Sequence, residues 1–137
     1  MFEKLTGNVQ GPLEVHGAVE IEGTLHGGAV VTGTLDLIGT CNGPIEVRLD
    51  GHADIEAVVR GNVLARSGTL RLRGILEGVL GAEPGADVQL AVGTIVNGRR
   101  LEADGTFTPV QGSFGFSIPD DAQMMRLQSD ATWTPVG

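Results

Sequence analysis

The chain has 137 residues, enough for a single domain, of which 41% are apolar but only 4% are aromatic. Its 22 glycines favour a narrow core with many tight turns, and because no Gly-x-y triplet persists, collagen is excluded. A net charge of −8 argues against general binding to nucleic acid or to anionic membranes, which requires clustered Lys and Arg. Without an apolar stretch of signal-peptide or membrane-span length, the sequence predicts a cytoplasmic protein.

The glycines of the first part of the chain recur in steps of four, six and six residues, so the pattern repeats about every sixteen residues. In chain order the repeats occupy residues 7–22, 23–38, 39–56, 57–73 and 74–91, and a partial sixth begins at Val92. The third repeat holds a two-residue insertion, Leu49-Asp50, and the fourth and fifth hold one and two extra residues. A β-sandwich with glycine turns is the alternative, but sandwich strands do not recur at a fixed spacing.

Apolar residues fall at fixed positions of each repeat, numbered 3, 7, 9, 13 and 15 from its first glycine. The third position collects Val9, Leu25, Cys41, Val59, Leu76 and Ile95, the seventh Leu13, Ala29, Ile45, Val63, Leu80 and Leu101, and the fifteenth Ile21, Leu37, Ile55, Leu72 and Leu90. Within the pairs 7/9 and 13/15, the spacing of two is the strand period. The sequence therefore predicts an all-β fold, a single-stranded β-helix (β-solenoid) domain over residues 1–105, with about six coils of three short strands each.

The first coil begins after only six residues, too few to cover its apolar face. Such an end exposes unpaired strand edges, which invite pairing with another chain. We expect self-association through this coil, and because one patch meets its own copy, a closed two-fold dimer rather than a filament. The residues expected in this contact are Phe2, Leu5, Val9, Leu13 and Val19.

The last segment, residues 106–137, loses the repeat and holds most of the aromatic residues. We expect a strand over Gln111 to Ile118, and a short helix from Asp120 or Asp121 to Leu127. The segment is predicted to cap the solenoid, and docking of a partner is the alternative or additional role. The residues expected in this role are Phe107, Phe114, Phe116, Met124, Leu127 and Trp133.

Charged residues also stack in columns, since position 14 holds Glu20, Asp36 and Asp54, followed by Arg71. Like charges about 4.8 Å apart repel one another mildly when they are solvated. The column is either a solvated outer face or an acidic stripe that binds a protein with a basic surface. The residues of the expected stripe are Glu14, Glu20, Glu22, Asp36, Asp54 and Glu56.

No catalytic or metal site is predicted, and no cofactor is expected. The histidines His16, His26 and His52 fall at three different coil positions, whereas a metal site needs ligands that converge on one point. The single cysteine, Cys41, falls in an apolar column and is predicted to be a small core residue. We therefore expect a protein that is not an enzyme, and a hexapeptide-type acyltransferase ranks last because no base lies in a predicted cleft.

The Gly-Φ-x-Gly rhythm and the segments RGNVLARSGTLRLRG and GAEPGADVQLAVGTIVNG resemble bactofilins over about residues 5–105. The resemblance implies a polymer-forming cytoskeletal protein with a right-handed β-helix core. The opening Met1-Phe2-Glu3-Lys4 is similar to a membrane-targeting motif of some bactofilins, but Glu3 and the lack of a following Lys cluster depart from it, so membrane binding is not expected.

Two functions remain open on the sequence alone. The first is a structural self-associating protein of bactofilin type, with a scaffold or cytoskeletal role. The second is a small acidic binding module that inhibits a partner protein, as an immunity protein, an inhibitor or a nucleic-acid mimic does.

Overall fold

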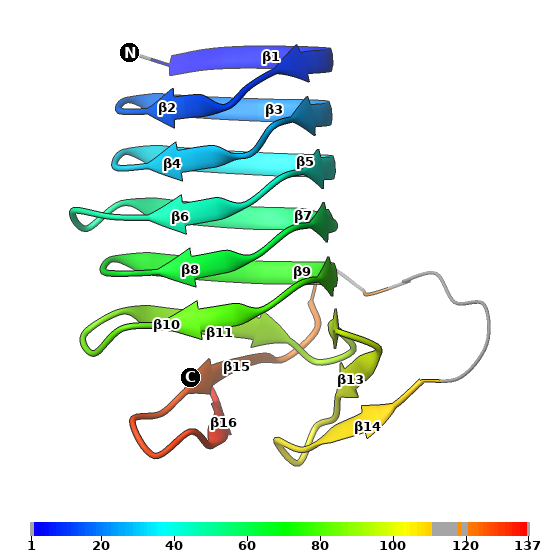
Figure 1. Ribbon diagram of the computed structural model, residues 1–137. Coiled ribbons are helices and arrows are strands. Elements are labelled where there is room, and N and C mark those ends of the chain that lie inside the picture. Colours follow the sequence, from blue (N-terminus) through cyan, green and yellow to red (C-terminus); the bar gives the residue numbers. More distant parts are fainter. Residues whose placement is uncertain (1, 111–117, 119–120, 137) are drawn as a thin grey trace.

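The computed structural model describes residues 2–110, 118 and 121–136, and these residues form strands and turns without a helix (Figure 1). Five long strands alternate with five short ones along the first part of the chain. The long strands are β1 (Phe2–Gln10), β3 (Ala18–His26), β5 (Thr34–Asn42), β7 (His52–Arg60) and β9 (Thr69–Glu77). The short strands are β2 (Leu13–Val15), β4 (Ala29–Val31), β6 (Ile45–Val47), β8 (Val63–Ala65) and β10 (Leu80–Ala82). One long and one short strand make each coil, which confirms the predicted β-solenoid of about six coils.

The long strands stack in parallel, each in register with the next along its whole length. Two of the three strands expected in each coil are joined here into one nine-residue strand that bends at position 1 of the repeat. At this bend Gly23 and Gly39 have φ values of +145° and +132°, a backbone conformation that residues with a Cβ rarely adopt. Glycine therefore lets the chain change direction while the ladder of backbone hydrogen bonds continues.

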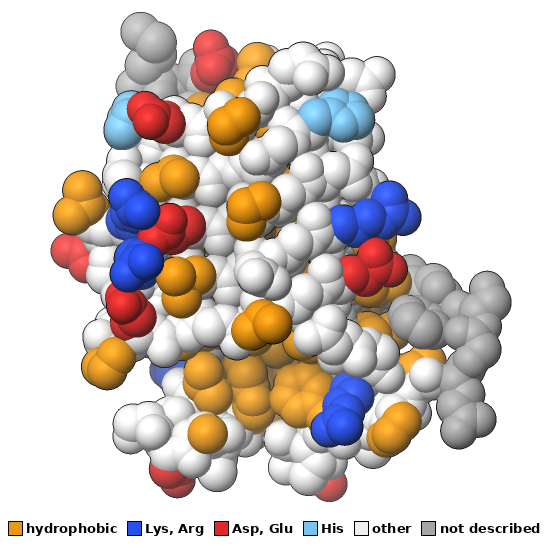
Figure 2. Space-filling view, in the orientation of Figure 1, with side chains coloured by type: hydrophobic (Ala, Val, Ile, Leu, Met, Phe, Trp, Pro, Cys, Tyr) orange, Lys and Arg blue, Asp and Glu red, His pale blue; other side chains and the backbone are white. Residues whose placement is uncertain are grey.

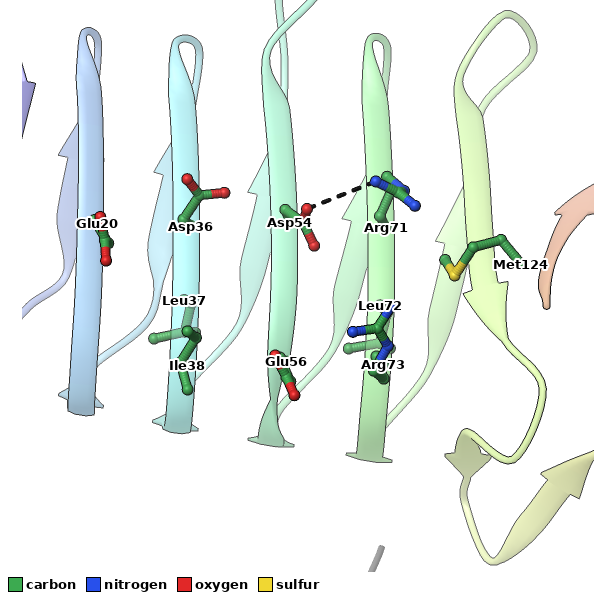
Figure 3. A pocket seen from close by; sticks show the side chains of 10 residues that line it. All are labelled: Glu20, Asp36, Leu37, Ile38, Asp54, Glu56, Arg71, Leu72, Arg73 and Met124. Atoms are coloured by element: carbon green, nitrogen blue, oxygen red, sulfur yellow. Dashed lines mark ion pairs between the residues drawn. The ribbon is translucent and has the colours of Figure 1, made fainter. Parts of the chain in front are cut away.

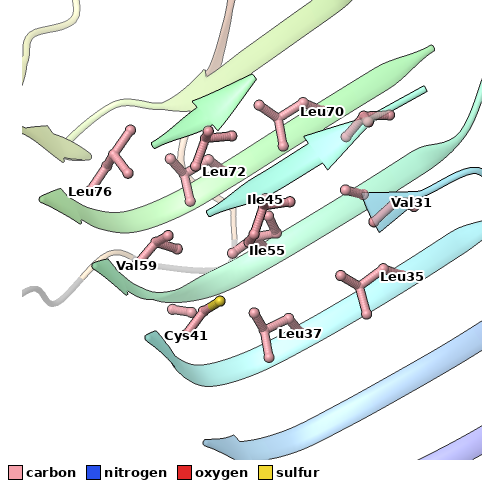
Figure 4. Close-up of a cluster of buried hydrophobic side chains, with 14 of the residues drawn as sticks. Val31, Leu35, Leu37, Cys41, Ile45, Ile55, Val59, Leu70, Leu72 and Leu76 are labelled. Carbon is pink, nitrogen blue, oxygen red and sulfur yellow. The ribbon is translucent and has the colours of Figure 1, made fainter. Parts of the chain in front are cut away.

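The short strands form a second, five-stranded parallel sheet, and the apolar columns fill the space between the two sheets. Figure 4 shows side chains of both sheets directed into this shared interior. Every residue of the position-15 column is completely buried, namely Ile21, Leu37, Ile55, Leu72 and Leu90. This column, predicted from the repeat, is confirmed, and its members pair directly from strand to strand.

The sixth coil departs from the repeat earlier than expected. The strand β11 (Asp87–Ala91) still pairs in parallel with β9, but a turn closed by the Thr94 N–H on the Ala91 carbonyl follows it. This turn takes up one residue more than the alignment assigned to it, so Val96 rather than Ile95 continues the column of Leu76. The assignment of Ile95 and Leu101 to the position-3 and position-7 columns is therefore wrong.

The remaining strands cover the last coil below the long strands, and apart from the parallel pairing of β12 with β9 they pair antiparallel. They are β12 (Ile95–Val96), β13 (Arg99–Leu101), β14 (Phe107–Pro109), β15 (Met124–Leu127) and β16 (Trp133–Pro135). In the described part of this region, β10 remains an edge strand that pairs with β8 alone. Figure 2 shows hydrophobic side chains gathered between the last coil and this antiparallel region, so the covering is incomplete on the side of the short strands.

The helix expected to end at Leu127 is wrong, because Met124–Leu127 is the strand β15, which pairs with β11 and β16. The free edge of β11 offers backbone partners that a single helical turn would leave unused. As a result the side chains alternate: Met125 is completely buried while Met124 lies on the outer face. Most of the strand expected over Gln111–Ile118 lies outside the described residues.

Candidate functional site

The N-terminal end of the solenoid is a bare strand edge. Among the described strands, β1 pairs with β3 alone, through all nine residues, and the outer edge of β1 carries no partner. The expected contact residues Leu5, Val9, Leu13 and Val19 are half-buried and pack against the core from this end. The equivalents of Leu5 and Val9 one coil further in are completely buried, so this end leaves core columns partly uncovered. Phe2 is the first residue of β1.

Glu3 places a carboxylate within this apolar end, and its position in a core column was not identified from the sequence. Glu3 pairs with Val19, and Val19 pairs with Leu35, which is completely buried, so an exposed carboxylate stands at the top of a core column. Charges that point inward at a sheet edge discourage indiscriminate pairing. Glu3 lies sixteen residues before Val19, so extending the repeat backwards from Gly7 would have placed it in the column.

At the opposite end, apolar residues of the last segment pack against the core. Phe107, Leu127 and Trp133 are half-buried there, and the Phe107 and Trp133 rings meet edge to face at 6.1 Å. The Arg126 guanidinium, on β15, bonds the Asp87 carboxylate on β11 at 2.8 Å. Burial opposes ionisation of Asp87, but the bonds from Arg126 and Gln89 still lower the pKa of its carboxyl group. Phe114 and Phe116 lie outside the described residues.

The acidic stripe lies on the outer face of the long strands, where Glu20, Asp36 and Asp54 follow one another in register (Figure 3). The column begins and ends with a cation, because Lys4 precedes Glu20 at 3.8 Å and Arg71 follows Asp54 at 3.7 Å. Lys4 was not identified from the sequence, although it stands sixteen residues before Glu20. The stripe is therefore an ion-pair ladder in which two of the three carboxylates face a cation.

A second, parallel column holds Glu22 and Glu56, and Lys4 also reaches Glu22 at 2.9 Å. Between these two carboxylates stands Ile38, which is 46% exposed. Glu14 does not belong to this face, because it lies on β2 in the five-stranded sheet, 3.5 Å from His16. The expected set of six acidic residues therefore reduces to five on one face.

Asp36 lies in the middle of the ladder with a carboxylate on either side. Its partial burial, together with Asp54 and Glu20, raises the pKa of the Asp36 carboxyl group, while His52 acts in the opposite direction. The surrounding hollow encloses about 270 Å³ and is lined by charged side chains, Ile38 and Met124. Small-molecule sites are usually larger and mostly apolar, so the hollow fits a protein surface better than a buried ligand.

The remaining reactive side chains do not converge. His16 bonds Thr32 at 2.9 Å, and His26 bonds Asn8 at 3.3 Å. Cys41 is completely buried, as predicted, and its burial raises the pKa of the thiol to about 11. Over residues 2–110, 118 and 121–136, no three potential metal ligands gather at one point. In the same part of the chain, no helix has the length and apolar character that crossing a bilayer requires.

Comparison with known proteins adds no family assignment. No family model matches the chain, and neither the curated proteins nor the solved structures gave a significant match. The β-solenoid architecture is therefore supported by the structure, and the likeness to bactofilins is supported by the repeat segments.

Proposed function

We propose that this chain is a structural, self-associating β-solenoid of bactofilin type, with a scaffold rather than a catalytic role. The observation that carries the proposal is the bare nine-residue edge of β1, beneath which core columns remain half-covered. Unpaired backbone groups next to apolar side chains favour the addition of another strand. We therefore place the contact at the N-terminal coil, around Leu5, Val9, Leu13 and Val19.

The difference between the two ends supports a closed pair over an open stack. The opposite end is covered below the long strands by β15 and β16, and the edge strand of its short-strand sheet, β10, has only three residues. A contact that uses only the N-terminal patch is the same on both copies, and this two-fold arrangement closes after two subunits.

The pairing of charges within the acidic face argues against the inhibitor alternative. Two carboxylates of the ladder, Glu20 and Asp54, already face Lys4 and Arg71 of the same chain, and Glu22 also pairs with Lys4. A surface that neutralises itself presents a weaker field to a basic partner than five free carboxylates would. Self-association is therefore the function that this geometry favours.

The direct test is analytical ultracentrifugation of the full chain over a concentration series, beside the variant Val9→Glu. We expect a dimer for the unchanged chain and weaker association for the variant, because the new carboxylate would be buried in the contact. The matched control is Thr34→Glu, which adds the same charge on an exposed position of β5, away from both ends. Thermal unfolding of all three chains verifies that each one is folded.

The control should dimerise like the unchanged chain. A strict monomer at every concentration would remove the proposal and favour the binding-module alternative. An assembly that Val9→Glu leaves intact would place the contact away from the N-terminal coil.

A further inference from the structure

Two departures from the repeat fall at the same corner of the solenoid, where each short strand passes into the next long strand. One is the turn between β6 and β7, with the insertion Leu49-Asp50, and the other is the turn between β10 and β11, residues 83–86. Figure 1 shows both turns projecting on the same side of the rod. Between them lies the corresponding turn of the fourth coil, since the backbone N–H of Arg66 donates to the Val47 carbonyl and that of Glu83 donates to the Ala65 carbonyl.

The first turn presents an exposed apolar side chain, that of Leu49, which we call the knob. Leu49 is 78% exposed, the highest exposure among the large exposed apolar residues of the described chain. It lies in a turn closed by the Gly51 N–H on the Arg48 carbonyl at 2.9 Å. Leu49 and Asp50 have φ values of +52° and +60°, which glycine, asparagine and aspartate adopt readily and leucine does not. An exposed leucine held in an unfavourable backbone conformation indicates a role outside its own fold.

The second turn forms one wall of a hollow. The tip of the β15–β16 hairpin forms the other wall, so the hollow opens at the same corner as the knob. Its lining is mostly small and apolar, and it consists of Ala82, Glu83, Pro84, Gly85, Ala86, Leu127, Gln128, Ser129 and Ala131. Leu127 at its base packs against the core, which makes this wall rigid.

We propose that the corner is a second contact between copies of this chain, in which Leu49 of each copy enters the hollow of the other. Knob and hollow lie on one edge, on opposite sides of the fourth coil. A two-fold axis midway between knob and hollow therefore brings both contacts together at once, and this reciprocal geometry is why a second copy fits better than an unrelated partner.

The charges between knob and hollow suit the same two-fold arrangement. Glu46 pairs with Arg48 and with Arg66, and Arg66 also bonds Glu83 at 3.2 Å, so both bases of the edge are paired with acids. In Figure 2 this edge carries basic, acidic and hydrophobic side chains in close succession. With Asp50 beside Leu49 the edge has three acids and two bases, so only a small net repulsion opposes its contact with its own copy.

This side contact is independent of the end contact at β1, and together they change the expected assembly. A subunit with one two-fold contact forms a closed dimer. A subunit with two different two-fold contacts forms either a closed tetramer or an open chain of alternating contacts. An open chain of this kind would need no further exposed surface at the C-terminal end.

The contact can be tested by cross-linking two variants of the full chain, Leu49→Cys and Ser129→Cys, that each add one cysteine and carry tags of different mass. Both positions are exposed, whereas Cys41 is completely buried and has a raised pKa, so it does not compete. We expect a mixed disulfide pair when the two are combined, and no pair from either variant alone. Val79→Cys, exposed by 61% on another corner, is the matched control and should not link to Ser129→Cys. Equal linking of the control, or none in the mixture, overturns the proposal.

A second variant separates association from folding. Leu49→Asn should leave the monomer as stable as before or more so, because asparagine accepts positive φ. In the Val9→Glu background, where the end contact is removed, it should weaken dimerisation about a hundredfold, since two buried leucine side chains are lost per dimer. Unchanged association in sedimentation velocity would overturn the side contact and leave the end contact untouched.

Discussion

At the N-terminal end the core finishes in a parallel edge strand, whereas at the C-terminal end it finishes under antiparallel hairpins. Every strand from β1 to β9 pairs in parallel with a strand of the next coil. The strands β15 and β16 instead pair with each other, so their hairpin closes on itself. A stack of parallel coils always leaves an unpaired strand edge at each end. The antiparallel hairpin covers this edge at the C-terminal end only.

The same difference is visible at equivalent residues. A Cβ added to Gly39, in the middle of the stack, would collide with the carbonyl oxygen of Gly23 in the coil before it. A Cβ added to Gly7, the same position of the first coil, would meet nothing within 4 Å. The N-terminal coil thus has the geometry of an interior coil without the neighbour that an interior coil requires.

The largest effect is expected in the interior, where both sides of a coil are covered. Leu72→Asp should prevent folding, because an unpaired carboxylate would lie between coils in the completely buried position-15 column. Leu72→Ala should lower the free energy of unfolding by about 2–5 kcal/mol, the usual range for a cavity of this kind. Circular dichroism and chemical denaturation measure both. A cooperative transition of unchanged midpoint for Leu72→Asp would contradict the stacked core.

The second effect compares the interior with the bare end directly. Gly39→Ala should destabilise by about 2 kcal/mol or more, because strain at φ of +132° adds to the collision with Gly23. Gly7→Ala should cost about 1 kcal/mol, since only its φ of +79° is unfavourable. Equal losses in urea denaturation would mean that the first coil is as tightly enclosed as the third.

The sequence predicted the stacked part well because its signal is local and repeated. Glycine at each corner and apolar residues two apart specify both the turn and the side of the strand that is buried. The register follows from the repeat, which is why the column from Ile21 to Leu90 was correct. Glu3 and Lys4 were missed only because the alignment was begun at Gly7, although they continue the same columns.

The last segment resisted prediction because its structure depends on partners distant in the sequence. Four residues, Met124–Leu127, are too few to distinguish the helical period from the strand period. The free edge of β11 decides between the two, and the sequence does not reveal that edge. The hollow beside Ser129 likewise arises where a turn of the fifth coil meets a hairpin formed some forty residues later.

A third prediction concerns the antiparallel end. Trp133→Ala should destabilise by about 2 kcal/mol, because the half-buried indole contacts both the core and the Phe107 ring. Val9→Ala, at the bare end, should cost less than about 1.5 kcal/mol, since one side of Val9 has no covering coil. Trp133→Phe should restore most of the loss. Thermal unfolding at a concentration low enough to keep the chain monomeric would measure the contrast, and a larger loss for Val9→Ala would reverse the assignment of covered and bare ends.

The smallest effect is expected on the charged face, which runs between the two ends. The pKa of Asp36 is raised above its ordinary value of 3.8 in the folded protein, first by burial and then by Asp54 and Glu20. A raised carboxyl pKa means that the charged form is less favourable in the folded state, so stability is highest while Asp36 is protonated and falls as the pH rises through the folded pKa. Asp36→Asn removes this loss, and it should stabilise the protein by a few tenths of a kcal/mol at pH 7, an effect limited by the partial solvation of the ladder.

Below pH 3.8 the advantage of Asp36→Asn should disappear, because the carboxyl group of the unchanged chain is then neutral as well. Asp54→Asn serves as the control, because it removes the same Asp36–Asp54 repulsion but also loses the ion pair with Arg71 at 3.7 Å. It should therefore not stabilise the protein. The measurement is the midpoint of thermal unfolding for the three chains between pH 3 and pH 7. If Asp36→Asn stabilised the protein equally at pH 3 and at pH 7, the stacked carboxylates would not repel one another measurably. The long strands would then tolerate stacked acids as readily as the ion pairs that Lys4 and Arg71 form at the two ends of the ladder.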